Sequence, residues 1–306
     1  MKTSIVLCTY NGSIYIKELI RSLNKLEGGF DELIVCDDNS SDDTISIIEE
    51  LLNKEIILGK VKIYINEHSL GAYGNFMKAC SLAGGDILFF CDQDDVWIKD
   101  KVSCMKKIMA SNKKINVLAA NLKPMYDGKI GLKEKIALER QVNDETLVMI
   151  KCKAMNLATR RSGCTMCVRK TYFQDVISRW TDNWAHDDFF WKMAVNDGSL
   201  AIINHLSVMR RVHGNNTSIN VKRTRENRIS QIEHEIEHAN IACNENSEES
   251  VLATKKFIMF MNKRIQNLKK PNIIILMIML LVYGRMYRSK SQMLMDIYLT
   301  INKRIK

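Results

Sequence analysis

The chain of 306 residues lacks a glycine-rich phosphate loop, because neither GxGxxG nor GxxxxGK[ST] follows any of its apolar β-type runs. The glycines of such loops let the backbone approach a pyrophosphate, so their absence argues against dinucleotide binding and P-loop hydrolysis. A mononucleotide can still be held by carboxylates that accept hydrogen bonds from the base and ribose, with a divalent metal on the diphosphate. The sequence therefore leaves nucleotide binding open in that form.

Long hydrophobic runs, internal repeats and complete zinc motifs are also missing. The longest apolar run, Ile273 to Tyr283, has 11 residues, about half of the roughly 20 that span a bilayer. Cys164 and Cys167 have CxxC spacing, but no second CxxC or His pair accompanies them, and we interpret the spacing as coincidence. Nine cysteines without a recognisable signal peptide predict free thiols in the core of a cytoplasmic protein.

Acidic residues are scarce towards the C-terminal end. Residues 221–306 hold 16 Lys and Arg against eight Asp and Glu, so most of the net charge of +10 belongs there. Such asymmetry predicts attraction to a polyanionic surface, either a membrane or a nucleic acid, unless it is only a solvated helix face. The basic stretch VKRTRENR (221–228) keeps a nucleic-acid binder as an alternative, although no known nucleic-acid motif accompanies it.

Short apolar runs alternate with helical patterns through the first 120 residues, as in a βαβ protein. The expected strands lie at 4–10, 32–37, 61–66 and 86–92, and the expected helices at about 16–23, 43–52 and 74–83. This order predicts a mostly parallel sheet with helices on both faces and ligands at the carboxyl ends of the strands.

The remaining segments are less regular. Residues 125–131 predict a turn and 143–152 a capped helix. Further expected elements are a strand at 162–170, a helix at 183–195, a strand at 199–216, and helices from 222 to about 240, from 249 to 268 and after Pro271. We therefore expect an α/β domain at 1–220 and a basic helical region at 221–306.

Polar residues follow three of the expected strands: TYNG (9–12), DDNSSDDT (37–44) and DQDD (92–95). Parallel strands end at the same edge, so these residues should share one rim. The DQDD carboxylates repel one another and need water, a cation or a basic partner. A bound metal is the main hypothesis, and a solvated turn that caps the next helix is the alternative. Ser40 with Asp43 fits a capping box, and we favour a helix-capping role for Ser40 to Thr44.

Six stretches in this order resemble a family 2 glycosyltransferase with the GT-A fold, over roughly residues 3–218. They are IVLCTYNG, DDNSSDDT, DQDDVW, GCTM, HDDFFW and HGNN. Within that family they look most like bacterial rhamnosyltransferases of cell-wall and O-antigen polysaccharide assembly. The resemblance implies the GT-A α/β fold, a mostly parallel sheet flanked by helices, with a helical C-terminal tail.

The resemblance also implies roles for the donor-side residues. Thr9, Tyr10 and Asn11 would line the nucleotide base pocket, and Asp37 or Asp38 would accept from the base NH. Asp92 would lie near the ribose and Asp94 would bind Mn²⁺ or Mg²⁺. Asp95 would assist either Asp92 or Asp94 in its role. Trp97 should pack beneath this loop, and Asn75 caps or braces it.

On the acceptor side, inversion at the anomeric carbon requires a base, for which the resemblance points to Asp187, with Asp188 one position away. Successive helical residues point about 100° apart, so one of the two would face the sugar. Arg211 would balance the diphosphate charge and His213 would contact the metal or a phosphate oxygen. Gly163, Cys164 and Thr165 would border the sugar pocket or form a core strand.

The implied activity is metal-dependent, inverting transfer of a sugar from a nucleotide diphosphate to a saccharide or lipid-linked saccharide in bacterial cell-surface polysaccharide synthesis. Rhamnose from dTDP-rhamnose is the first hypothesis; a UDP-hexose or UDP-N-acetylhexosamine donor, or a degenerate non-catalytic scaffold, are the alternatives. Ile273 to Tyr283 with its basic flanks would lie on the inner face of the plasma membrane, or else close the fold or an oligomer.

Overall fold

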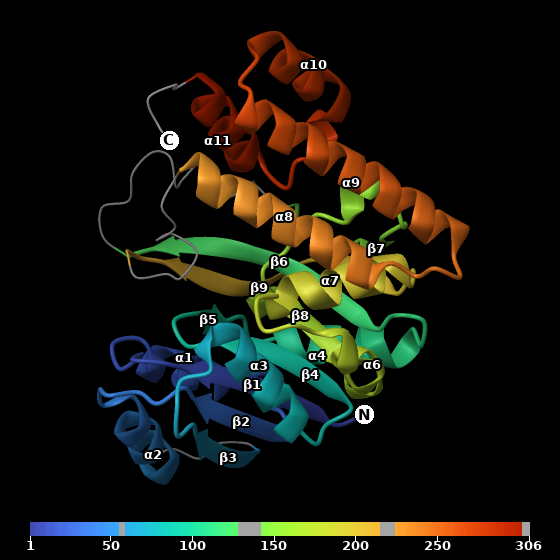
Figure 1. Cartoon of the computed structure of the whole chain (residues 1–306). Helices are drawn as coiled ribbons and strands as arrows, with labels where there is room; N and C mark the ends of the chain where they lie inside the picture. The colour runs from blue at the N-terminus through green and yellow to red at the C-terminus, as the bar shows by residue number, and fades with distance from the viewer. Residues whose placement is uncertain (55–58, 128–141, 215–223, 302–306) are drawn as a thin grey trace.

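The computed structural model describes residues 1–54, 59–127, 142–214 and 224–301 (Figure 1). Most of the expected turn at 125–131, the two asparagines of HGNN and much of the 221–228 basic stretch lie outside these residues.

The first third of the chain forms the expected βα units. Its elements are β1 (Thr3–Thr9), α1 (Ile16–Leu23), β2 (Glu32–Asp37), α2 (Thr44–Lys54), β3 (Lys60–Ile65), α3 (Gly71–Leu82) and β4 (Ile87–Asp92). The four strands pair in parallel in the order β3-β2-β1-β4. The alternating pattern is therefore confirmed, and the carboxyl ends of β1, β2 and β4 lie beside one another.

Later strands extend this sheet and make it mixed. They are β5 (Val96–Trp97), β6 (Val117–Tyr126), β7 (Leu147–Met149), β8 (Met166–Arg169) and β9 (Leu200–Val212). Among the described residues the order is β3-β2-β1-β4-β8-β6-β9-β5, with β7 beside β9. The parallel pairs have the long ladders, whereas β8, β5 and β7 make short antiparallel ones.

Helices cover both faces of the sheet because its buried strands are apolar on both sides. Ile5 and Leu7 pack towards α1, α2 and α4 (Lys101–Ser111), whereas Val6 packs on the opposite face with α3, α6 (Lys170–Val176) and α7 (His186–Asn196). Short 3-10 turns are at Ala154–Asn156, Gly163–Thr165, Ile177–Arg179 and Gly284–Met286.

The C-terminal helices pack on the α7 side of the sheet (Figure 1). They are α8 (Arg225–Ala242), α9 (Glu248–Lys269), α10 (Ile273–Tyr283) and α11 (Lys290–Ile301). Side chains of α8 and α9 join the core that contains β1 and α7. The division of the chain at residue 220 stays a prediction. No helix in the described part is long and apolar enough to cross a membrane.

Two local predictions are wrong. The helix expected at 143–152 is absent, and Leu147–Met149 instead form β7, whose exposed side chains lie along β9. Backbone hydrogen bonds to Asn204 fix this edge strand, which the sequence pattern does not reveal. The strand expected at 162–170 is confirmed only for β8, since Gly163–Thr165 form a buried 3-10 turn before it.

Candidate functional site

The three polar stretches meet at one edge of the sheet. Thr9 is paired with Asp37 in the β1–β2 ladder, and Cys8 with Asp92 in the β1–β4 ladder. The carboxyl ends of β1, β2 and β4 are therefore adjacent, as parallel pairing requires. We call this edge, with Asp92 to Asp95, the acidic rim.

The β1 end is held by Gln93, which pairs with the backbone of Tyr10. Its Oε1 accepts from the Tyr10 N–H at 2.8 Å, and its Nε2 donates to the Tyr10 carbonyl at 2.9 Å. A Cβ at Gly12 would meet Gln93 Oε1 at 2.2 Å, so this close approach requires glycine. The phenol ring of Tyr10 stays exposed at the rim.

Asp37 and Asp38 are both buried and have different surroundings. Asp37 accepts from the Thr9 hydroxyl at 2.5 Å and from the backbone and side chain of Ser40. Asp38 accepts from Asn66 and Ser69 and from the backbone N–H groups of residues 70 and 71. Burial works to raise the Asp38 pKa, but these hydrogen bonds hold it below its usual range. Asp38 therefore has every acceptor position filled.

The capping role favoured for Ser40 to Thr44 is wrong for Ser40 itself, although another residue of this stretch caps α2. Its hydroxyl donates to Asp37 and accepts from the Asn11 N–H at 2.9 Å, four residues before α2 begins. Asp42 instead accepts from the Thr44 N–H at 3.0 Å, at the start of α2. Ser40 thus joins two strand ends rather than starting a helix. Asn75 braces the neighbouring strands, because its amide donates to the Cys36 carbonyl.

Asp92, Asp94 and Asp95 form the centre of the acidic rim. Burial raises the pKa of Asp92 and Asp95 above the usual carboxyl range, and mutual repulsion with Asp94 adds to the rise. Oδ1 of Asp95 accepts from the Arg211 N–H at 3.0 Å. Its Oδ2 is buried with no hydrogen-bond partner among the described residues. The rim therefore holds more negative charge than its own hydrogen bonds neutralise.

Strand β9 and the residue after it bring basic side chains to the rim. Burial acts to lower the Arg210 pKa, but Cys164 and the carboxylates of Asp92, Asp95 and Asp94 lie close enough to hold it above its usual value. Nε2 of His213 lies 2.8 Å from Asp94 Oδ2. Arg210 thus provides part of the compensating charge that the carboxylate cluster requires, and His213 contacts Asp94 directly.

Arg211 is engaged elsewhere. Its Nε donates to the Asp94 carbonyl at 2.9 Å and its Nη2 lies 2.5 Å from Glu18 Oε2, while the guanidinium covers the Tyr15 ring at 4.7 Å. These contacts hold β9 against α1 and the DQDD turn. They make Arg211 a positioning residue of the rim.

Lys101 lies behind the rim and is fully buried. Its ammonium lies 3.2 Å from the centroid of the Trp97 ring and donates to the Cys164 carbonyl at 2.6 Å. Burial lowers its pKa to about 8, although nearby thiols and Asp95 act in the opposite direction. Trp97 is buried beneath the loop, as expected.

The two adjacent aspartates of α7 have separate environments. Asp188 is buried and bonds to Lys192 Nζ at 2.5 and 2.6 Å, to Trp184 Nε1 at 2.8 Å and to Thr159. Asp187 is only half-buried, and Oδ1 accepts from the Asp188 N–H. Its charge contributes to the raised pKa of Asp92. Asp187 is therefore the more accessible carboxylate of the pair, whereas Asp188 is held inside α7 by its ion pair with Lys192.

His186 positions the start of α7. It is buried against Phe76 and Phe90 at ring-centroid distances of 3.9 and 4.9 Å, with neither ring nitrogen hydrogen-bonded in the described part of the chain. Burial lowers its pKa to about 4, so the imidazole is neutral at physiological pH. A Cβ at Gly163 would lie 2.3 Å from His186 Nε2. The glycine of GCTM thus allows this contact.

The donor set of the rim fits a divalent metal. Asp92, Asp95 and Cys164 place one ligand atom each within 4.8 Å of one another, and the buried Asp95 Oδ2 has no hydrogen-bond partner within the described part of the chain. Carboxylate oxygens and an imidazole, supplied here by Asp94 and His213, are ligands that Mn²⁺ and Mg²⁺ sites accept. Thr165 lies in the same buried turn as Cys164.

Comparison with known proteins identifies the family. The profile of the family described as "Glycosyl transferase family 2" matches residues 4–177, which is more than half of the chain. The chain belongs to glycosyl transferase family 2. The matched region contains the acidic rim and the GCTM turn, and ends before α7.

Two curated bacterial relatives of this family 2 chain differ in their donor sugar. The UDP-Glc:alpha-D-GlcNAc-diphosphoundecaprenol beta-1,3-glucosyltransferase WfgD of Escherichia coli is 34% identical over 109 residues, 36% of this chain and 41% of that protein. The dTDP-rhamnosyl transferase RfbG of Shigella flexneri is 32% identical over 99 residues, 31% and 34% of the two chains. The matches thus span well under half of either relative.

A solved structure confirms the GT-A fold expected for this family 2 chain. S. aureus TarS 1–349 in complex with UDP-GlcNAc superposes with a TM-score of 0.66 at 18% identity, covering 99% of this chain and 92% of that one. The similarity extends through the C-terminal helices, so these are part of the shared architecture.

Arg210, Lys101 and Gln93 were not predicted from the sequence of this family 2 chain. Of the two adjacent arginines, the family resemblance assigned a role to Arg211 and none to Arg210. Strand alternation places adjacent residues on opposite sides, which was the available indication that only one arginine could face the rim. Lys101 and Gln93 carried no indication of their roles.

Proposed function

We propose that the protein is a metal-dependent, inverting glycosyltransferase that moves a sugar from a nucleotide diphosphate to an acceptor hydroxyl. One observation carries the proposal: of the two adjacent aspartates, Asp187 is half-buried and accessible as a base, while Asp188 is held in a buried ion pair. A degenerate, non-catalytic scaffold would have no need to keep both the acidic rim and a carboxylate that can act as the base.

On the donor side, the exposed Tyr10 ring offers a stacking surface for the base. Thr9 and Asn11 hold the strand ends beside it. Asp37 is preferred over Asp38 for the base N–H, because its bonds from Thr9 and Ser40 leave one of about four acceptor positions open among the described residues. Asp37 is fully buried, so Ser40 has to turn aside when the base binds.

A divalent metal, held by Asp94 with Asp92, Asp95 or His213, would neutralise the charge that develops on the departing diphosphate. Arg210, rather than Arg211, supplies the protein's own positive charge there, since Arg211 is tied to Glu18 and the Asp94 carbonyl.

On the acceptor side, Asp187 takes the proton from the attacking hydroxyl. The neutral His186 and Gly163 fix the helix end that carries it. Because the acceptor oxygen bonds to the anomeric carbon from the face opposite the leaving diphosphate, the anomeric configuration inverts. Gly163, Cys164 and Thr165 border the sugar between the two sides.

Nucleoside diphosphate release tests this function directly. Wild type, Asp94→Ala and Asp187→Asn would be assayed with a panel of nucleotide sugars, with and without Mn²⁺ or Mg²⁺, using bacterial membrane lipid as acceptor source. Asp187→Asn should lower kcat by about 10²- to 10⁴-fold while donor binding persists, and Asp94→Ala should lose metal-dependent donor binding.

Asp182→Asn is the matched control, because Asp182 is an exposed carboxylate close to α7 in the sequence. It should retain wild-type turnover. Full activity of Asp187→Asn would refute the assignment of the base, and absence of donor binding with every metal would favour the non-catalytic scaffold.

For the donor, we propose dTDP-rhamnose, supported by the DQDDVW and HGNN resemblance and by the Shigella flexneri relative. UDP-glucose is the second candidate, because the Escherichia coli relative is named for it. Thermal stabilisation by one nucleotide sugar over the other separates them: a larger shift with UDP-glucose would discard rhamnose and keep the mechanism.

For the acceptor, we propose a lipid-linked saccharide at the inner face of the plasma membrane, reached through α10. Only Leu276 and Met279 of this helix are buried. Its exposed apolar side chains are Ile273, Ile274, Ile275, Met277, Ile278, Leu281 and Val282. Exposed basic residues flank it, namely Lys269, Lys270, Arg285, Arg288 and Lys290. An apolar surface with cationic flanks suits anionic headgroups.

Vesicle co-sedimentation tests the membrane contact. The protein should bind vesicles of phosphatidylglycerol more strongly than those of phosphatidylcholine. The double substitution Leu281→Glu with Val282→Glu should abolish binding, whereas Leu252→Glu, on an exposed position of α9, should not. A stable dimer that the double substitution dissociates, without vesicle binding, would instead assign α10 to self-association.

A further inference from the structure

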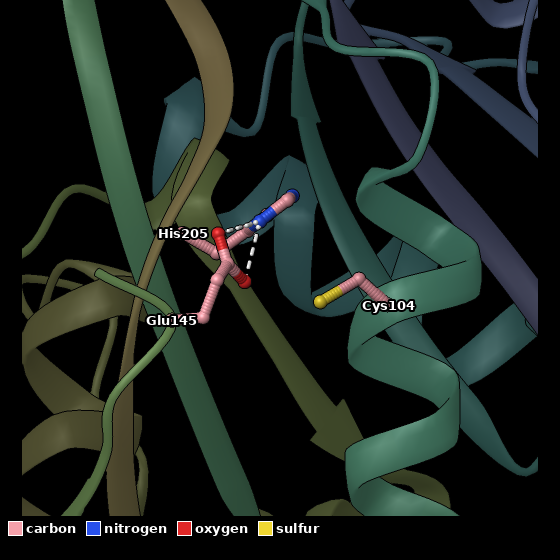
Figure 2. A group of neighbouring side chains, drawn as sticks. All are labelled: Cys104, Glu145 and His205. Carbon is pink, nitrogen blue, oxygen red and sulfur yellow. Dashed lines mark hydrogen bonds and ion pairs between the residues drawn. The ribbon is translucent and has the colours of Figure 1, made fainter. Parts of the chain in front are cut away.

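Three side chains outside the acidic rim bring a sulfur, an oxygen and a nitrogen ligand together. They are Cys104 of α4, Glu145 just before β7, and His205 of β9. Figure 2 shows the three converging from separate segments. Their ligand atoms all lie within 4.8 Å of one another.

His205 has an orientation that metal-binding histidines commonly show. Its Nδ1 lies 2.8 and 3.0 Å from the two Glu145 oxygens (Figure 2), while its Nε2 lies 3.1 Å from Asp100 Oδ1. In a histidine that binds metal through one nitrogen, the other N–H usually donates to a carboxylate, which fixes the ring. Asp100 occupies the place of that outer carboxylate.

We propose that Cys104, Glu145 and His205 form a zinc site separate from the acidic rim. Thiolate, imidazole and carboxylate are the ligands of tetrahedral Zn²⁺, and a thiolate favours zinc over Mg²⁺ or Mn²⁺. Zinc–ligand bonds of about 2.0 to 2.3 Å place ligand atoms roughly 3.3 to 3.8 Å apart. The separation of up to 4.8 Å closes by rotation of the exposed Glu145 and the half-buried Cys104.

Binding replaces protons with the metal. The Cys104 thiol gives up its proton to become the thiolate ligand, and His205 binds through an unprotonated Nδ1. The exposed Glu145 side chain leaves the fourth position to water. The bound ion would join α4, the segment before β7, and β9, three parts of the chain that meet here without a covalent link.

The alternative is an imidazolium that bridges Glu145 and Asp100 without a metal. The two carboxylates raise the pKa of His205 despite its burial, so this bridge is chemically sound. It does not require a sulfur atom, however. Dependence of binding on the Cys104 thiol therefore separates the two arrangements.

Cobalt titration of the full chain with Asp94→Ala, which removes one of the proposed rim ligands, provides the test. We expect one equivalent of Co²⁺ to give a thiolate-to-cobalt charge-transfer band that one equivalent of Zn²⁺ removes. Adding Cys104→Ser should abolish the band and weaken Zn²⁺ binding at least tenfold. His205→Gln should weaken Zn²⁺ binding to a similar extent.

Cys164→Ser is the matched control, because Cys164 lies beside the rim carboxylates rather than His205. The band should persist in it. A band that follows Cys164, or survives Cys104→Ser, would overturn the proposal, as would absence of Co²⁺ and Zn²⁺ binding by folded protein.

A second measurement keeps the native Cys104. Alkylation of Cys104 by iodoacetamide, mapped by peptide mass spectrometry, should be at least tenfold slower with Zn²⁺ than after chelation, in the same Asp94→Ala chain. Equal rates would refute the site even if Cys104→Ser failed to fold. Neither measurement depends on glycosyl transfer, so the zinc proposal can be tested whether or not the proposed function is correct.

Discussion

A methyl group added to Gly163 would meet His186 Nε2 at 2.3 Å, and the imidazole cannot retreat because it is packed between Phe76 and Phe90. Gly163→Ala should therefore displace the start of α7 and with it Asp187. We expect kcat to fall at least tenfold with little change in donor KM, and the protein to be destabilised by about 1–3 kcal/mol.

Steady-state kinetics and thermal unfolding measure both effects. Gly84→Ala is the control, because a Cβ there meets only Glu32 oxygens at an ordinary 3.8 Å. Unchanged kcat in Gly163→Ala would show that His186 does not set the position of the base.

Arg210 and Arg211 are adjacent, but substituting one or the other should have different effects. Arg210→Gln removes the cation that faces the rim carboxylates, so donor affinity should fall at least tenfold while the melting temperature changes little. Arg211→Gln breaks the contacts to Glu18 and the Asp94 carbonyl, so it should lower the melting temperature as well. Donor affinity and melting temperature should be measured for both variants. Equal changes in both quantities would contradict the separate roles of the two arginines.

Which arginine faces the rim depends on the register of β9 against β5, where Val96 pairs with Met209. The alternation of strand residues was visible in the sequence, but that register was not. By contrast, the DQDD aspartates and HDDFFW were found because strand ends and helix starts follow from apolar periodicity. Asp187 and Asp188 were left as alternatives until the partners of Asp188, above all Lys192, were known.

At the scale of elements, α11 is attached through Asp296. Its carboxylate accepts from Arg264 at 2.7 and 3.1 Å and from Arg228 at 3.0 Å, which joins α11 to α9 and α8. Asp296→Asn leaves two buried guanidinium groups without their anion and should cost about 3 kcal/mol of stability. Hydrogen exchange in α11 should rise. Glu237→Gln, an exposed change on α8, is the control.

The ion pairs of Asp296 also predict how the stability of the C-terminal helices depends on acidic pH. Burial works to raise the Asp296 pKa, but Arg264 and Arg228 hold it below its usual value of 3.8. Its contribution to stability is thus present above the unfolded-state pKa and lost as pH falls through the lower folded-state pKa. The pH dependence of unfolding below about 4 should be shallower in Asp296→Asn than in wild type.

Element prediction succeeded where apolar spacing was long and regular. Ile16, Leu19, Ile20 and Leu23 are all buried in α1, as their helical spacing indicates. Prediction failed at 143–152, because β7 has three exposed residues and exists only by pairing with β9. A short edge strand of this kind takes its structure from its partner and leaves no periodic pattern of its own.

At the scale of the whole molecule, the rim makes stability depend on pH and metal. Asp92 and Asp95 have raised pKa values in the folded state, so these two groups bind more protons in the native protein than in the unfolded chain. Their contribution to the stability of the metal-free protein should therefore fall as pH rises above the ordinary carboxyl range near 4. Mn²⁺ binds the ionised carboxylates and should raise the melting temperature more at pH 8 than at pH 5.

Thermal melts at the two pH values, with and without Mn²⁺, check this prediction. Asp94→Ala should lose most of the metal-dependent increase at pH 8. An increase of equal size at both pH values would show that the rim carboxylates are already ionised at pH 5 and that their burial does not oppose charge.

The rim also sets an order for the protein's own synthesis. Asp94 and His213 are 119 positions apart in the sequence, and Asp95 and Arg211 are 116 apart. A nascent chain emerges from its N-terminal end, so the first four strands can form while β9 is still untranslated. Until β9 arrives, the growing chain carries an acidic edge without Arg210, Arg211 or His213. Premature termination before β9 would therefore leave the rim carboxylates without the arginines and the imidazole that normally lie against them.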